Sequence, residues 1–192
     1  MMKSIYDWCM RMVGGPFAVP ALVSVSFIES SFFPIPPDLL LIPLILARRN
    51  EAFKLAFYTT VASVIGGWFG YFIGWFLYDT VGIWLLNFYD AKAQFETFVD
   101  YYHEWGAWIV FGAGLTPFPY KIITIASGVT HLDFATFTIA SILARGMRFF
   151  FIAWLLYKWG KPMKDYIEKN LGWLSVLFLV LLIGSFYVIK LM

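Results

Sequence analysis

Long apolar stretches alternate with short polar ones along this chain of 192 residues. A helix needs about 18–20 apolar residues to cross a bilayer. The stretches at 53–78, 133–158 and 171–191 reach that length and contain no proline. The pattern therefore predicts three full transmembrane helices.

Two further apolar stretches, at 17–47 and 107–129, are interrupted by prolines. The interrupting prolines are Pro34, Pro36 and Pro37 in the first stretch and Pro117 and Pro119 in the second. Each removes a backbone donor and disfavours helix at the residue before it. A ten-residue helical piece reaches only about 15 Å, roughly half the hydrocarbon core. We therefore expect two re-entrant helical hairpins, each buried in protein or lining a wet cavity.

The polar segments predict helices that lie outside the membrane core. Residues 1–15 carry apolar side chains at helical spacing and predict a short interfacial helix. The segment 79–106 holds five acidic residues against one lysine, a net charge of −4, and its part 91–105 predicts an amphipathic helix. We interpret 79–106 as a polar connector.

The positions of the basic residues predict an orientation. Cytoplasmic loops of membrane proteins carry an excess of Lys and Arg. If only the three long helices cross, the N-terminus and the basic segments 48–54 and 158–169 share one side, and the acidic connector lies opposite. The two hairpins then enter from opposite faces.

A weak internal repeat supports that arrangement. Shifted by 83 positions, Pro34 and Pro36 fall on Pro117 and Pro119, and a full helix follows each broken stretch. Broken helices at corresponding positions of two halves point to the binding site of a transporter. We expect one membrane domain with an inverted repeat, residues 17–78 and 107–158.

Composition places the chain among membrane proteins. Hydrophobic residues make up 61% and charged residues 14%, against about 25% charged in soluble domains. One cysteine and two histidines argue against a zinc site, and no cofactor or nucleic-acid partner is indicated. The sequence shows no acidic cluster for Mg²⁺ and no Ser/His pair, so an enzyme is not expected.

Five ionisable residues lie inside the apolar stretches: Glu29, Asp38, Lys121, Arg145 and Arg148. Arg145 lies near the middle of the stretch 133–158, about 18–20 Å from each end. A charge at that depth costs about 2.5–3.5 kcal/mol on insertion scales unless it is paired or hydrated. Arg145 and Arg148 share one helix face because they are three residues apart.

Two interpretations of these charges remain open. They can neutralise one another and hold the helices together. Alternatively, they line a polar cavity, with Asp38 and Lys121 at the N-termini of half-helices that favour anions. In that arrangement Lys121, Arg145 and Arg148 suit a phosphate headgroup, and Glu29 and Asp38 are candidates to carry a proton.

Gly66, Gly70 and Gly74 form a GxxxGxxxG ladder inside the stretch 53–78. Small residues at this spacing let another helix approach closely in a membrane. We expect the ladder to be a packing face.

The chain resembles the DedA family, also called SNARE-associated or VTT-domain membrane proteins, over about residues 17–160. The resemblance rests on FIESSFFPIPPDLLLIP, GGWFGYFIG, LTPFPYKIITIASG and ARGMRFFFIAWLLYKWG. It implies opposed re-entrant hairpins with scramblase or lipid-transport activity. For bacterial members it implies a role in recycling a polyprenyl-phosphate carrier lipid, dependence on the proton gradient and a place in the inner membrane.

The second hairpin departs from the family pattern. Many members carry Arg-Phe-x-Pro-x-x-Arg there, whereas this chain has Gly114 and Tyr120 at the two arginine positions, and Lys121 follows one residue late. We take Lys121 with Arg145 or Arg148 as candidate replacements.

The leading hypothesis is that the protein is a flippase or scramblase for an anionic lipid and can form a homo-oligomer. The alternatives are a proton-coupled exchanger of a small solute and a structural protein of membrane integrity. A proton flux in vesicles without the lipid favours the first alternative.

Overall fold

A computed structural model describes residues 17–32, 36–82, 92–116, 118–160 and 162. These residues form helices and turns, with no strand among them. The helices are α2 (Ala18–Ser31), α3 (Asp38–Ala47), the 3₁₀ turn η1 (Arg49–Glu51), α4 (Ala52–Leu77), the π-helical turn η2 (Tyr78–Gly82), α6 (Lys92–Leu115), α7 (Tyr120–Val129) and the helix Phe134–Gly160, here called the last helix. The interfacial helix expected at 1–15 and the transmembrane helix expected at 171–191 lie outside the described residues.

Prolines separate the short helices, as the sequence predicts. Pro37 immediately precedes α3, and Pro119 immediately precedes α7. A proline is tolerated at a helix start because the first backbone N–H groups have no partner within the helix. Pro34 and Pro117 lie outside the described residues.

Two helices are long and apolar enough to cross a membrane: Arg49–Leu77, with 29 residues, and Phe134–Gly160, with 27. At 1.5 Å per residue each reaches about 40 Å, more than the hydrocarbon core of about 30 Å. They correspond to the stretches predicted at 53–78 and 133–158. Asp133 immediately precedes the last helix, and its Oδ2 accepts the backbone N–H of Thr136 at 2.7 Å.

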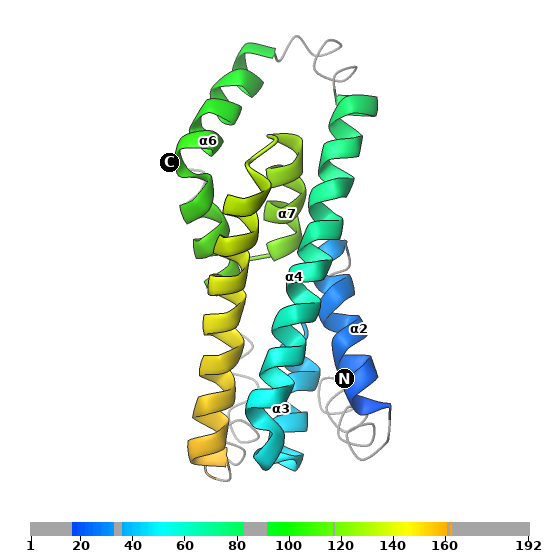
Figure 1. Cartoon of the computed structure of the whole chain (residues 1–192), viewed down its shortest axis with the longest axis vertical. Coiled ribbons are helices and arrows are strands. Elements are labelled where there is room, and N and C mark those ends of the chain that lie inside the picture. Colours follow the sequence, from blue (N-terminus) through cyan, green and yellow to red (C-terminus); the bar gives the residue numbers. More distant parts are fainter. Residues whose placement is uncertain (1–16, 33–35, 83–91, 117, 161, 163–192) are drawn as a thin grey trace.

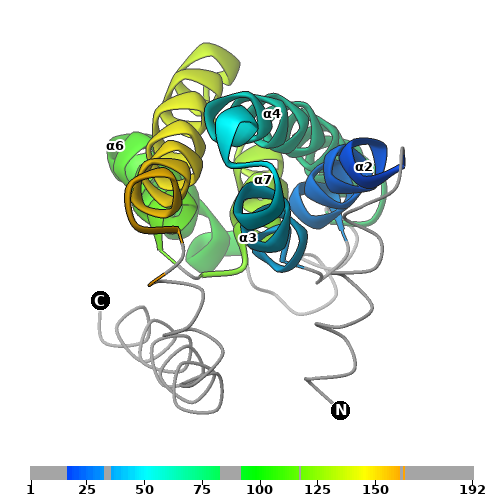
Figure 2. The ribbon, with the colours of Figure 1, turned by 90° about the horizontal axis from the view of Figure 1, so that it is seen from below.

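The short helices occupy opposite ends of the long ones (Figure 1). α2 and α3 lie beside the lower part of α4, whereas α6 and α7 lie toward its upper end. α3 begins inside the molecule and runs to the lower end, and α7 begins near the middle and runs upward. Seen from below, α7 lies behind α3, between α4 and α6 (Figure 2).

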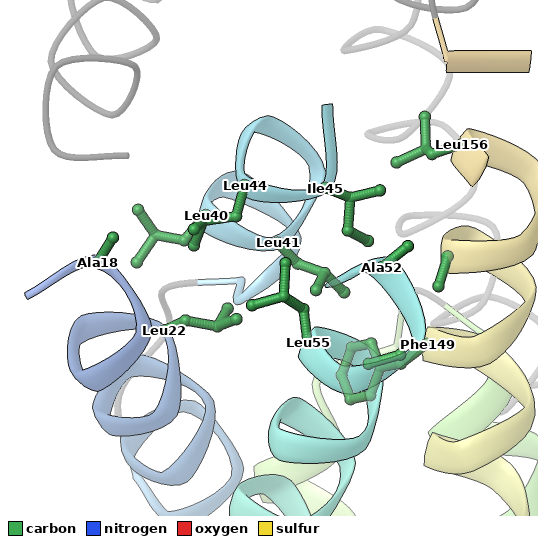
Figure 3. Packing of buried hydrophobic residues seen from close by; sticks show 12 residues of the cluster. Ala18, Leu22, Leu40, Leu41, Leu44, Ile45, Ala52, Leu55, Phe149 and Leu156 are labelled. Carbon is green, nitrogen blue, oxygen red and sulfur yellow. The ribbon is translucent and has the colours of Figure 1, made fainter. Parts of the chain in front are cut away.

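Two apolar clusters hold this arrangement together. In the lower cluster, Leu41 and Ile45 of α3 lie toward α4 and the last helix, where Leu55 and Phe149 pack, and Leu44 lies on the side of α2 (Figure 3). All five side chains are almost completely buried. The upper cluster joins the upper part of α4, α6, α7 and the start of the last helix.

The glycine ladder is the packing face that the sequence predicts. A Cβ at Gly66 would lie 2.2 Å from the carbonyl oxygen of Phe27 in α2, and one at Gly74 would lie 2.0 Å from that of Ile125 in α7. Gly128 of α7 meets the backbone of α4 as closely. Both short helices can approach α4 only because these side chains are absent.

α6 is longer than the amphipathic helix expected at 91–105, since it continues without a break to Leu115. Gly106 lies where the polar and apolar parts join, and a Cβ there would lie 2.7 Å from Cδ1 of Leu132. Residues 92–106 of the polar connector and the first limb of the second broken stretch are therefore one helix.

The outer faces of the two long helices are apolar. On α4 the exposed large side chains recur every three or four residues, and the last helix carries a similar row. These residues are Phe53, Phe57, Val61, Ile65, Phe69, Phe72 and Phe76 on α4, and Ile139, Ile142, Leu143, Met147, Phe150, Phe151 and Trp154 on the last helix. An apolar surface of this extent is typical of contact with lipid.

Candidate functional site

A layer of buried polar side chains separates the lower and upper apolar clusters. Its members come from α2, α4, α7 and the last helix. They are Ser26, Ser30, Ser31, Thr59, Thr60, Ser63, Thr124, Ser127, Ser141 and Arg145. Buried hydroxyls need hydrogen-bond partners, and here they find them in one another and in backbone carbonyls, so the layer ties the four helices together.

Arg145 forms the centre of this layer. Its side chain is 2% exposed, and its Nη2 lies 2.7 Å from Oε2 of Glu29 in α2. Its Nε donates to Oγ of Ser63 in α4 at 2.6 Å. The sequence predicted an embedded arginine that requires a partner, and the structure supplies a carboxylate and hydroxyls from two other helices.

Hydroxyls and rings complete the surroundings of the Arg145–Glu29 pair. Ser30 donates to Glu29 at 3.1 Å and shares a hydrogen bond of 2.7 Å with Ser63. The rings of Tyr120 and Phe149 each lie 4.8 Å from the guanidinium carbon of Arg145. Rings on either side of a desolvated guanidinium add cation–π attraction to the ion pair.

Arg148, three residues further along the last helix, forms a second ion pair. Its Nη2 meets Oδ2 of Asp38 in the first turn of α3, and its Nη1 donates to the carbonyl oxygen of Thr116 at 2.8 Å. The two charged side chains are 17% and 18% exposed. Arg148 therefore connects the start of α3 to the break after α6.

The second carboxylate oxygen of Asp38 has no partner. Oδ1 is the one buried side-chain oxygen or nitrogen among the described residues that forms no hydrogen bond. A buried acceptor without a donor costs free energy. Oδ1 of Asp38 therefore lacks, among the described residues, the donor that a buried carboxylate oxygen needs.

The two pairs join the two sides of the first break to one face of the last helix. Glu29 and Asp38 lie on opposite sides of the first break, and Arg145 and Arg148 share one face of the last helix. Each arginine thus holds one limb of the first broken stretch. An unpaired charge in apolar surroundings is far costlier than a paired one, so this pairing also fixes how the limbs pack.

Lys121 does not join these pairs. It lies in the first turn of α7 and is partly exposed, and its ammonium forms no ion pair with any described residue. A cavity of about 350 Å³ between α6 and the last helix is lined by Trp108, Phe111 and Leu143 among others, and not by the paired residues. A role of Lys121 in headgroup binding and a cavity at the ion pairs both stay predictions.

The hydroxyl ligands were not identified from the sequence, although a signal for them is present. Ser26 and Ser30, Thr59 and Ser63, and Ser141 and Arg145 are each four residues apart in apolar helices. Four residues return to the same helix face. A polar stripe on an apolar helix indicates a contact with another polar stripe in the membrane interior.

Comparison with known proteins shows the family of this chain. The family model of the VTT domain matches residues 35–158, which include all of α3, α4, α6 and α7 and the last helix up to Lys158. The chain belongs to the VTT-domain family. As a member of the DedA type, it is a membrane protein.

Two relatives of this VTT-domain protein match it over nearly its whole length. An uncharacterized protein of Haemophilus influenzae is 37% identical over 193 residues, 97% of each chain. An uncharacterized protein of Histophilus somni is 37% identical over 178 residues, 91% of this chain and 92% of its own. No solved structure matches the chain.

The two positions that lack the family arginines border Arg145 in this VTT-domain protein. A Cβ at Gly114 would lie 2.7 Å from Cβ of Ala144, so no larger side chain fits between α6 and the last helix. Tyr120 is fully buried, donates to Ser141 and stacks on Arg145. Arg145 on the last helix is a cation that lies against both of these positions.

Proposed function

We propose that this protein moves an anionic lipid headgroup across the membrane, with Arg145 and Arg148 as headgroup ligands. The observation that carries the proposal is the pair of arginine–carboxylate contacts in a buried polar layer between two apolar clusters. Ionisable residues inside a membrane protein are costly and mark pathways for substrates and ions.

The geometry supports exchange of a carboxylate for a phosphate. A guanidinium binds a carboxylate and a phosphate with the same two-pronged geometry. In the arrangement described above, Glu29 is paired with Arg145 and Asp38 with Arg148. Protonation of a carboxylate removes its negative charge and frees its arginine, so an entering phosphate replaces the acid. The proton and the headgroup are coupled in this way.

The helix starts favour the same ligand. α3 and α7 both begin inside the molecule, with Asp38 and Lys121 in their first turns. The N-terminus of a helix carries a partial positive charge that attracts anions. A phosphate between these starts meets two helix ends as well as the arginines.

We further propose that α2–α3 and α6–α7 act as re-entrant hairpins that enter from opposite faces, related by an inverted repeat. The bounds of α4 shifted by 83 positions fall on 135–160, which nearly coincides with the last helix. The breaks before α3 and α7 are related by almost the same shift. Opposed hairpins bring the two breaks to the membrane centre.

The lower end, with Arg48, Arg49, Lys54 and Lys158, faces the cytoplasm by the positive-inside rule, and the membrane is the bacterial inner membrane. The substrate is a phospholipid or, as the family resemblance implies, a polyprenyl-phosphate lipid. No covalent step is involved, no nucleic acid is bound, and the chain can act as a homo-oligomer.

The test is lipid movement in vesicles that contain the purified protein. Glu29→Gln, Asp38→Asn and Arg148→Gln are expected to lower the transfer rate of a headgroup-labelled anionic lipid at least tenfold. Glu104→Gln, an exposed acid on α6, is the control and is expected to match the wild type. Transfer at the wild-type rate in all three variants would refute the proposal.

Two further measurements separate the alternatives. Lipid movement by pure protein without a proton gradient identifies a passive scramblase, whereas movement only with a gradient identifies a driven transporter. A proton flux in vesicles that lack the anionic lipid contradicts lipid transport and favours exchange of a small solute.

A further inference from the structure

A second cavity lies at the lower end of the molecule, away from the ion pairs. It has a volume of about 620 Å³ and lies between the start of α4 and the end of the last helix. Its lining consists of Arg49, Asn50, Phe53, Trp154, Tyr157 and Lys158. The volume is within the range of about 300–1,000 Å³ that is common for small-molecule sites.

The basic side of the cavity is built by Arg49. Its guanidinium donates to the backbone carbonyl oxygens of Tyr157 and of Lys158, the latter at 2.9 Å, and its side chain lies against Gly160. These carbonyls belong to the C-terminal turn of the last helix, whose partial negative charge would repel an anion. Arg49 compensates that charge and orders the cavity wall.

The aromatic side of the cavity is a connected set of rings. The rings of Phe53 and Tyr157 lie 5.4 Å apart, and the ammonium of Lys158 lies 5.5 Å from the ring of Trp154 and 4.8 Å from that of Trp159. Tryptophan and tyrosine concentrate at the level of lipid headgroups, where their rings face acyl chains and their polar atoms face water.

The charge balance of the cavity favours an anion. Two cations and one amide line it, and no acid is among the described residues of its wall. The helix Arg49–Leu77 starts here, and the acid of its first turn, Glu51, is not part of the cavity wall. Two cations, an amide and a set of aromatic rings therefore converge on one space.

We propose that this cavity binds the phosphate headgroup of an anionic membrane lipid at the basic face of the membrane. Lys158, Asn50 and Arg49 contact the phosphate, and the rings of Phe53, Trp154 and Tyr157 contact the glycerol and upper acyl carbons. Basic pockets between helix ends at the cytoplasmic surface are suited to such headgroups. This lipid is a resident ligand, and the proposal does not depend on transport at Arg145 and Arg148.

The test compares lipid retention by purified full-length variants. The protein is taken from vesicles that contain equal amounts of phosphatidylcholine and phosphatidylglycerol, washed in detergent, and its retained lipids are measured by mass spectrometry. The wild type is expected to enrich phosphatidylglycerol. Lys158→Gln, which leaves all backbone contacts in place, is expected to lower the enrichment about fivefold, the effect of one basic charge near a lipid surface.

Controls separate the site from general surface charge. Lys54→Gln removes a cation at the same end of the molecule but outside the cavity, and it is expected to retain lipid like the wild type. Equal retention in Lys158→Gln, Lys54→Gln and the wild type would overturn the proposal. Displacement of the lipid by millimolar inorganic phosphate alone would also overturn it, since the site would then recognise free phosphate. The rate of lipid movement in vesicles with Lys158→Gln tests the transport proposal and not the binding of lipid at this cavity.

Discussion

Arg145 retains its charge in apolar surroundings because several partners meet it at once. A carboxylate, two hydroxyls and two aromatic rings surround its guanidinium, and only 2% of the side chain is exposed. Removal of one member of such a pair leaves the other charge buried without a counterion. The stability of the protein therefore depends on the pair as a unit.

This coupling predicts a non-additive mutant cycle. Glu29→Gln and Arg145→Gln are each expected to lower the unfolding temperature in detergent, and the double variant is expected to lose less than the sum of the two. The coupling energy is expected to be about 0.5–3 kcal/mol, as for other residues in direct contact. Additive losses would show that Glu29 and Arg145 are independent.

The residues of the site were predictable from the sequence, but their pairing was not. Charges in apolar stretches are visible in one sequence, and so is the shared face of Arg145 and Arg148. Which helix faces meet depends on the packing of separate elements. The sequence interpretation placed Asp38 and Lys121 at the starts of two helices, and both lie there, but it did not indicate that Asp38 pairs with Arg148 and that Lys121 stays outside both pairs.

The packing of α2 and α7 on α4 depends on backbone contact at the glycine ladder. Gly66→Ala and Gly74→Ala would each place a Cβ about 2 Å from a carbonyl oxygen of another helix. The backbone cannot yield as a side chain can, so we expect each variant to lose at least 1–3 kcal/mol of stability, on the order known for overpacked cores. Thermal unfolding in detergent measures this loss.

Gly112 provides the matched control for the ladder. A Cβ at Gly112 meets no atom within 4 Å. Gly112→Ala is therefore expected to keep or raise the unfolding temperature, because alanine favours helix over glycine by about 1 kcal/mol. Equal effects at Gly66 and Gly112 would contradict the close packing described for α2 and α4.

The start of the last helix is expected to show a pH-dependent stability. The backbone N–H and hydroxyl of Thr136 donate to Asp133 and hold the pKa of that carboxyl below its ordinary value of 3.8. A lowered pKa in the folded state contributes stability above the ordinary pKa, and this contribution is lost as the pH falls through the folded pKa.

Asp133→Asn keeps a capping side chain but not the charge. The difference in unfolding temperature between wild type and Asp133→Asn should shrink toward acid pH, and a constant difference would contradict the charged cap.

The helix boundaries show where a sequence is informative. Pro37 and Pro119 indicated the starts of α3 and α7, since a proline ends one helix and is tolerated at the start of the next. The junction between the polar and apolar parts of α6 carried no such signal. Polarity changes there at Gly106 without a change of backbone, and the helix continues to Leu115.

The whole molecule presents basic residues at one end and acidic residues of α6 at the other. The positive-inside rule then predicts opposite accessibility of the ends. In a Cys9→Ser background, we expect Glu96→Cys to react with a membrane-impermeant maleimide in intact cells and Asn50→Cys to react only after permeabilisation. Reaction of both from the same side would contradict the orientation.

A role of the Asp38–Arg148 pair in transport and a purely structural role predict different results when both charges are removed. The double variant Asp38→Asn/Arg148→Gln removes both charges of the more exposed pair, so no uncompensated charge remains in the membrane. If the pair only holds α3 against the last helix, a neutral, hydrogen-bonded pair serves the same purpose. If Arg148 binds the headgroup, the neutral pair cannot support transfer of the lipid.

The most direct measurement is the transfer rate of a headgroup-labelled anionic lipid in vesicles that contain this double variant. The variant is first shown to unfold within a few degrees of the wild-type temperature. If Arg148 binds the headgroup, we expect vesicles with the double variant to show the transfer rate of protein-free vesicles. Transfer at the wild-type rate by the folded, neutral variant would contradict it and leave Asp38 and Arg148 with a structural role alone.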